Sequence, residues 1–179
     1  MTTLHIDSSI NGDTSASRAI SRSIAGQIAT DRLVYRDLVA EPLPHLTLDA
    51  FADTSVLDEF LAADTVVIGA PMYNFTLPSQ LKAWLDRILV AGKTFRYTES
   101  GPEGLAGGKR VIVALARGGM YDAGTPAAAL EHLESYLRGI FNFIGIEPEF
   151  VAADGLNFGP DQREASISAA LGETMRLAA

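Results

Sequence analysis

Apolar and polar residues follow two different repeats along this chain. Five short apolar runs, rich in β-branched residues, are typical of strands and cover residues 4–7, 33–38, 65–71, 110–116 and 149–153. Their apolar character is nearly continuous rather than alternating. Such runs are expected where helices cover both faces of a parallel sheet.

Between these runs, apolar residues recur every three or four positions, which is typical of amphipathic helices. The repeat joins Ile20, Ile24 and Ile28, and it returns within 56–61, 81–89, 130–144 and 167–175. Alternating strands and helices predict an α/β fold with right-handed crossovers. We expect a flavodoxin-like doubly wound sheet of five parallel strands, in the order 2-1-3-4-5 with helices on both faces, or a Rossmann-like half. No repeat or linker interrupts the pattern, so residues 1–179 are predicted to form one domain.

Composition narrows the classes of function. The absence of cysteine excludes disulfides, zinc–thiolate sites, iron–sulfur clusters and a cysteine nucleophile. A net charge of −8 argues against nucleic acid or an anionic membrane as a partner. No metal is expected, because His5, His45 and His132 are scattered without ligand spacing. The first residues lack the pattern of a signal peptide and no apolar run is long enough to span a membrane, so a cytoplasmic location is expected.

In this fold the ligand lies beyond the carboxyl ends of the strands, so the loops there are informative. The first strand leads into DSSINGDTSAS (7–17), where Ser9, Ser15 and Ser17 supply hydroxyl groups before a helix. Hydroxyls and the free N–H groups of a helix N-terminus together predict a phosphate cradle. Arg18 can add one positive charge. Neither G-x-G-x-x-G nor a P-loop is present, which makes NAD and ATP poor candidates for a stably bound ligand.

Two further loops indicate a flat ring. Met72, Tyr73, Asn74 and Phe75 follow the third strand and combine apolar groups with one amide, which suits a heteroaromatic ligand. The fourth strand leads into ARGGMYDAG (116–124), whose glycine pair allows close approach of the backbone and whose arginine would stabilise a reduced, anionic flavin. The three loops together predict a mononucleotide with a large flat ring, for which non-covalent FMN is the expected cofactor.

Several motifs carry a more specific resemblance. They are SSI followed by S-x-S (8–17), APMYNF (70–75), FRYTESGPEGL (95–105), ARGGM (116–120) and FNFIGIEP (141–148). Over nearly its whole length the chain resembles the FMN-dependent NADH:quinone oxidoreductase and azoreductase family. The resemblance implies a homodimer with FMN sites near the interface. It also implies a ping-pong cycle in which NADH or NADPH delivers hydride to FMN and a quinone or azo compound takes two electrons.

The resemblance also assigns roles to residues. The phosphate would be held by the serine loop, the isoalloxazine would lie against the loop after the third strand, and the Arg-Gly-Gly loop would border its far edge. The implied FMN-binding residues are Ser9, Ser15, Ala16, Ser17, Met72, Tyr73, Asn74, Phe75, Arg117, Gly118 and Gly119. No protein residue is required as a catalytic acid or base, and Tyr121 is a candidate substrate contact.

The chain departs from the family pattern at two places. Ala116 stands where the family usually has serine, so a hydroxyl contact is lost there. The segment of about 39–56 is shorter than the family norm, which affects the expected substrate range and dimer contact. The alternative function is a flavodoxin-type electron carrier without substrate turnover. A receiver-like signalling domain is disfavoured because the third strand ends in GAPMYN, without a phosphorylatable aspartate.

Overall fold

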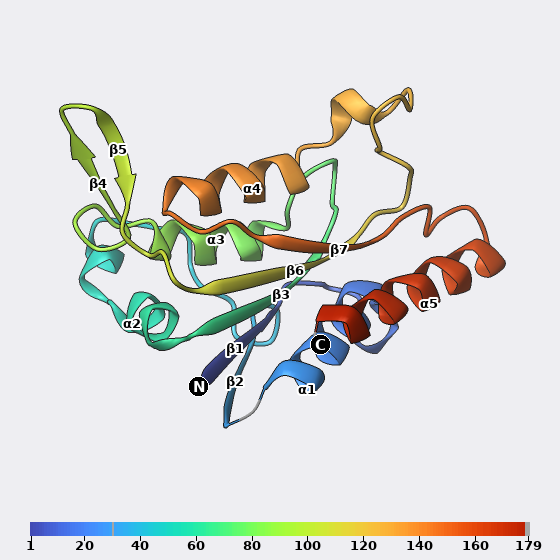
Figure 1. The fold of residues 1–179 in the computed structure, drawn as a ribbon, viewed down its shortest axis with the longest axis horizontal. Helices are drawn as coiled ribbons and strands as arrows, with labels where there is room; N and C mark the ends of the chain where they lie inside the picture. The colour runs from blue at the N-terminus through green and yellow to red at the C-terminus, as the bar shows by residue number, and fades with distance from the viewer. Residues whose placement is uncertain (30, 178–179) are drawn as a thin grey trace.

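A parallel sheet with helices on both faces forms the centre of the computed structural model, which describes residues 1–29 and 31–177 (Figure 1). Its strands, in sheet order, are β2 (Arg32–Asp37), β1 (Thr2–Asp7), β3 (Thr65–Pro71), β6 (Arg110–Ala116) and β7 (Glu149–Ala153). Counting these five along the chain gives the order 2-1-3-4-5. The predicted flavodoxin-like sheet is therefore confirmed. The ends of each predicted strand lie within two residues of the ends of the observed strand.

The register of the strands brings their carboxyl ends to one edge. Asp7 lies opposite Gly69, and Ala116 lies between Pro71 and Ala153 in neighbouring strands. The central strands β3 and β6 are buried along nearly their whole length, as their β-branched residues predict. The loops after β1, β3, β6 and β7 consequently meet at this edge.

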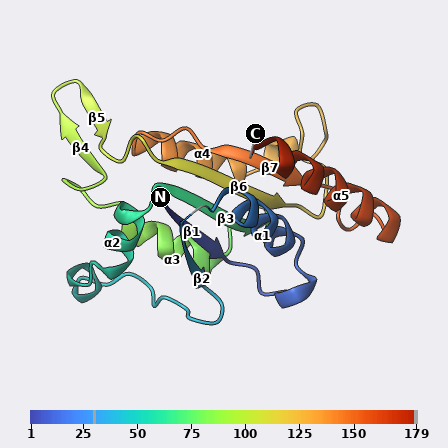
Figure 2. The same cartoon turned by 60° about the horizontal axis from the view of Figure 1, so that its bottom comes forward.

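Helices cover the two faces of the sheet unequally (Figure 2). On one face lie α1 (Ala16–Ile28) and α5 (Pro160–Leu177), which pack against each other. On the other face lie α2 (Ser55–Ala62), α3 (Ser79–Ile88) and α4 (Glu134–Phe143), around the fully buried Trp84. The Phe60 ring meets that indole edge-on at 5.9 Å. Each helix therefore buries much of the apolar stripe by which it was predicted, although Leu61 and Met175 stay 36% and 67% exposed.

The helix predicted over 130–144 is shorter than expected, and that prediction was wrong at its start. Residues Ala128–Leu130 form a separate 3-10 turn, and α4 begins only at Glu134. The carboxylate of Glu131 accepts hydrogen bonds from the backbone N–H groups of Leu133, Glu134 and Ser135. These are donors that the first turn of a helix leaves without partners, so Glu131 fixes where the helix starts.

A two-stranded hairpin, β4 (Phe95–Thr98) with β5 (Gly101–Gly104), projects beyond the sheet (Figure 1). Neither strand was predicted from the apolar pattern, since the segment is polar and mostly exposed. Its base packs on the end of α4, where the rings of Phe95 and Phe143 lie 4.7 Å apart. Gly104 is needed at this contact because a Cβ there would lie 2.2 Å from the Gly145 nitrogen.

Between β2 and α2, residues 38–54 contain one short 3-10 turn, Asp49–Ala52, as their only helix or strand. The guanidinium of Arg87 ties this segment to α3 by donating to the Pro44 carbonyl at 2.9 Å.

Within residues 1–29 and 31–177, none of the helices has the length and apolar character needed to cross a membrane.

Candidate functional site

The four loops at the carboxyl edge enclose a cavity of about 240 Å³, which we call the polar cavity. It brings together residues from the loops after β1, β3 and β6, as predicted, and also from the loop after β7. Its lining consists of Ser9, Asn11, Ser15, Ala16, Pro71, Met72, Tyr73, Ala116, Gly118, Leu156, Asn157 and Arg163.

The predicted serines lie together and are almost fully buried. The hydroxyl oxygens of Ser15 and Ser17 are 3.1 Å apart, and the Ser15 hydroxyl also caps α1 by accepting from the Arg18 backbone N–H. On the opposite side, the Ser9 hydroxyl lies 3.2 Å from the hydroxyl of Tyr73. The loop thus presents hydroxyls beside the N-terminus of a thirteen-residue helix, a combination that favours an anion.

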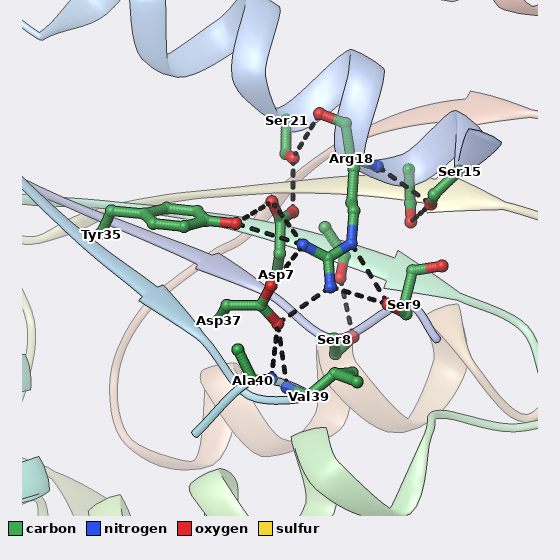
Figure 3. A network of polar contacts seen from close by, with 12 residues as sticks. Asp7, Ser8, Ser9, Ser15, Arg18, Ser21, Tyr35, Asp37, Val39 and Ala40 are labelled. Atoms are coloured by element: carbon green, nitrogen blue, oxygen red, sulfur yellow. Dashed lines mark hydrogen bonds and ion pairs between the residues drawn. The ribbon is translucent and has the colours of Figure 1, made fainter. Parts of the chain in front are cut away.

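Arg18 does not line this cavity, and the expectation that it adds a charge to the cradle was wrong. Its guanidinium donates two hydrogen bonds to the Ser9 carbonyl, at 3.1 and 2.8 Å, and two to the carboxylate of Asp37, at 2.6 and 2.8 Å (Figure 3). The hydrogen bond from Arg18 lowers the pKa of Asp37, helped by the N–H groups of Val39 and Ala40. Arg18 therefore fixes the backbone of the serine loop from behind.

A buried carboxylate lies beneath the same loop (Figure 3). Asp7, at the end of β1, is fully buried and accepts hydrogen bonds from the hydroxyls of Ser21 at 2.8 Å and Tyr35 at 3.0 Å. Burial, together with the charge of Asp7, raises the pKa of Tyr35 to about 12. Only glycine fits at position 69 in β3, because a Cβ there would lie 2.4 Å from an Asp7 carboxylate oxygen. Beneath the serine loop, the carboxylate of Asp7 is thus held by hydrogen bonds from neighbouring side chains.

The loop after β3 turns back tightly on itself. Tyr73 and Thr76 exchange two backbone hydrogen bonds, and between them Asn74 and Phe75 adopt left-handed backbone with φ of 48° and 72°. A large residue held in this region costs about 1–3 kcal/mol and is more frequent at functional sites than elsewhere. The turn leaves Phe75 44% exposed, beside Tyr121, whose ring meets it edge-on at 6.5 Å. Tyr73 and Asn74 also line a second, wider hollow of about 630 Å³.

Arg117 occupies a different place from the one expected. It is 4% exposed, it is not among the residues that line the polar cavity, and its guanidinium donates to both carboxylate oxygens of Asp154, at 2.6 and 2.7 Å. Carboxylates of Glu134 and Glu131 lie 3.4 and 3.7 Å from it. Burial opposes ionisation of Glu131, but the backbone N–H groups at the start of α4 hold its pKa below the usual value. Arg117 thus joins β6, the loop after β7 and α4, and its contact with a ring edge stays a prediction.

The first of the two glycines that follow it borders the cavity. Gly118 lines it, and a Cβ at that position would lie 2.3 Å from the side-chain nitrogen of Asn157. A Cβ at Gly119 would lie 3.2 Å from the nearest atom of the Tyr121 ring. Backbone hydrogen bonds from Asn157 to Gly118 and from Gly155 to Gly119 fasten this loop to the one after β7.

Sequence reasoning missed Asn157 and Arg163, both of which line the polar cavity. They belong to the segment GLNFGPDQR, which follows the last strand. The position of that strand was predicted, and all parallel strands present their carboxyl ends at one edge. Including this fourth loop in the search would have found both residues.

Comparisons with known proteins agree with this fold. The family described as "Flavodoxin-like fold" matches residues 1–177. The chain is 56% identical to FMN-dependent NADH:quinone oxidoreductase 2 of Bradyrhizobium diazoefficiens, over 96% of each chain. It is 54% identical to the FMN-dependent NADH:quinone oxidoreductase of Sinorhizobium fredii, over 99% of this chain and 100% of the relative. Among solved structures, azoreductase AzrA superposes with a TM-score of 0.88 at 31% identity, covering 99% of each chain.

Proposed function

The chain belongs to the family of FMN-dependent NADH:quinone oxidoreductases, and from this premise we propose that it reduces quinones and azo compounds with NADH. The reaction would follow a ping-pong cycle. It would run through FMN that is held non-covalently in the polar cavity. The single observation that carries the assignment of the site is the convergence of buried serine hydroxyls and a helix N-terminus at one end of that cavity. Residues 1–179 would act as one FMN-binding domain. The cytoplasmic location stays a prediction.

The residues present fit this cofactor. Ser9, Ser15 and the backbone of Ala16 line the cavity and offer the neutral donors that a phosphate needs. Ser17 lies directly behind, in contact with Ser15. Gly118 fits because its missing side chain leaves room at the wall formed with Asn157. The cavity is therefore a cradle with hydroxyls at one end and bare backbone along one side.

Bound FMN would supply the redox chemistry, taking two electrons from NADH and giving two to the acceptor. The chain's own residues bind and orient it. Met72 and Tyr73 line the polar cavity, Asn74 lines the wider hollow, and Asn74 and Phe75 form the strained turn against which the ring would lie. The Tyr73 hydroxyl also accepts the Ile10 N–H at 3.0 Å, which links the ring-binding turn to the phosphate-binding loop.

The substrate would enter beside the exposed Phe75 ring, which meets the ring of Tyr121 edge-on. Tyr121 thereby stays the candidate substrate contact. NADH is the donor that the relatives' names give.

A homodimer with FMN sites near the interface is part of the proposal. Leu133, just before α4, and Leu137 and Phe141 within it are fully buried in the chain's own core, so these apolar side chains are not available to a partner. Those that remain exposed include Tyr97 on the hairpin, at 75%, and Leu130, at 43%. We expect sedimentation velocity to show a dimer at micromolar concentration, and a monomer would contradict this assembly.

Removal of two hydroxyls tests the site. In Ser15→Ala combined with Ser17→Ala, FMN should bind more weakly, since each hydrogen bond to a charged phosphate contributes about 1.5–3 kcal/mol. Fluorescence titration with FMN gives the affinity, and Ser168→Ala, on the exposed side of α5, is the control. An unchanged affinity in the double variant would place the phosphate elsewhere.

Steady oxidation of NADH by benzoquinone in the unaltered protein distinguishes the enzyme from an electron carrier.

A further inference from the structure

Arg163 reaches the polar cavity from the far end of the sequence. It lies in the first turn of α5, and its Nη2 donates to the carbonyl of Thr14, the residue just before Ser15, at 2.7 Å. The same side chain lines the cavity together with Ser15 and Ala16. A guanidinium from the last helix is thus placed beside the serine loop.

This guanidinium differs from the neighbouring ones in its partners. Arg18 is paired with Asp37, and Arg117 is paired with Asp154, both outside the cavity lining. In residues 1–29 and 31–177, no carboxylate lies within ion-pair distance of Arg163, and it is the one cationic side chain among the residues that line the polar cavity. In a protein with a net charge of −8, such a charge is available to an anionic ligand.

The backbone around Arg163 holds it in place. Its own N–H donates to the Gly159 carbonyl at 3.0 Å, in the turn that starts α5. Upstream, the Leu156 and Asn157 N–H groups donate to the carbonyls of Arg117 and Gly118, at 3.2 and 3.0 Å. These hydrogen bonds hold the start of α5 against the wall of the cavity. They therefore fix the backbone position from which the Arg163 side chain reaches the cavity.

We propose that Arg163 supplies a positive charge that partly neutralises the FMN phosphate and makes the site select FMN over riboflavin. The inference rests on the proposed function. The serines and the helix N-terminus contribute only neutral donors, whereas a phosphate monoester carries nearly two negative charges. A guanidinium has five N–H donors, of which the contact with Thr14 uses one, so the others can reach phosphate oxygens.

The test compares two ligands that differ only in the phosphate. FMN and riboflavin are titrated by flavin fluorescence against the unaltered protein, Arg163→Ala and Arg163→Lys, at low and high salt. Arg163→Ala should bind FMN about 10-fold to 100-fold more weakly and riboflavin as before. Arg163→Lys should recover part of the lost FMN affinity, and the salt dependence of FMN binding should weaken in Arg163→Ala.

Arg176→Ala is the matched control, because it removes the same charge from an exposed position near the other end of the same helix. An Arg163→Ala protein that loses FMN and riboflavin equally would show a merely structural role and overturn the proposal. Unchanged FMN affinity in that variant would overturn it as well. If the unaltered protein binds neither ligand, the proposed function is refuted, and the role assigned to Arg163 is refuted as well.

Discussion

The clamp between Arg18 and Asp37 should be needed for both stability and cofactor binding, and Asp37→Asn separates the two. The substitution keeps the shape of the side chain but removes its charge and one acceptor. Arg18 gives Asp37 two short hydrogen bonds, and the same guanidinium holds the Ser9 carbonyl. A weaker clamp should therefore loosen the serine loop.

The magnitude follows from the contacts. A hydrogen bond to a charged group contributes about 1.5–3 kcal/mol. The side chain of Asp37 is 22% exposed, and asparagine keeps one acceptor, so solvent screening and partial replacement reduce the expected loss to about 2 kcal/mol. For a chain of this size the urea midpoint should fall by roughly 1 M. Urea unfolding of the flavin-free proteins, followed by circular dichroism, measures it.

The effect should depend on pH in one direction. Arg18 holds the pKa of Asp37 below its unfolded value. The stabilisation is therefore fully present above about pH 3.9, and it is lost as the pH falls through the lower folded value. Because the variant lacks this carboxylate, the difference in free energy of unfolding between the two proteins should shrink below about pH 4. A difference that stays constant from about pH 6 to about pH 3 would refute the reasoning.

Glu59→Gln provides the matched control. Glu59 pairs with Arg36 in a similar two-bond arrangement, with side chains 22% and 19% exposed, and it lies outside the cavity lining. It should lose stability while keeping its FMN affinity, whereas Asp37→Asn should lose both. Equal FMN affinity in the two variants would show that Arg18 does not position the serine loop.

Two other substitutions have definite expectations. Arg117→Ala leaves three carboxylates without their shared cation and should cost about 3–5 kcal/mol in urea unfolding, and a loss below about 1 kcal/mol would contradict the buried pairing. Phe75→Gly should leave stability unchanged or raise it by about 1 kcal/mol, because glycine accepts left-handed backbone. The same variant should turn over quinones more slowly, and undiminished turnover would remove Phe75 from the substrate region.

The parts of the site that sequence could predict are those set by local pattern. Ser9, Ser15 and Tyr73 lie where expected, because strand ends in a parallel sheet share one edge and short loops cannot carry their residues far. The central strands β3 and β6 were recognisable for a similar reason, since burial on both faces demands nearly continuous β-branched runs. Both the strands and these site residues follow from the local sequence and from the rule that parallel strands present their carboxyl ends at one edge of the sheet.

Partner choice could not be predicted in the same way. Arg18 finds Asp37 nineteen residues on, and Arg117 finds Asp154 thirty-seven residues on. A charged residue near a loop looks the same in sequence whether it faces the ligand or a buried carboxylate, and only the tertiary structure decides. The start of α4 was missed because the carboxylate of Glu131 overrides an apolar repeat that begins earlier.

The contact between α5 and the first loop has a consequence for how the protein is made. The serine loop leaves the ribosome well before the helix that covers α1 and brings Arg163 to Thr14. While translation continues, the nascent chain can form β1, α1 and β2 without the wall from the end of the sequence. FMN capture should then wait until α5 has been synthesised, and a message truncated before α5 would yield a chain that stays colourless.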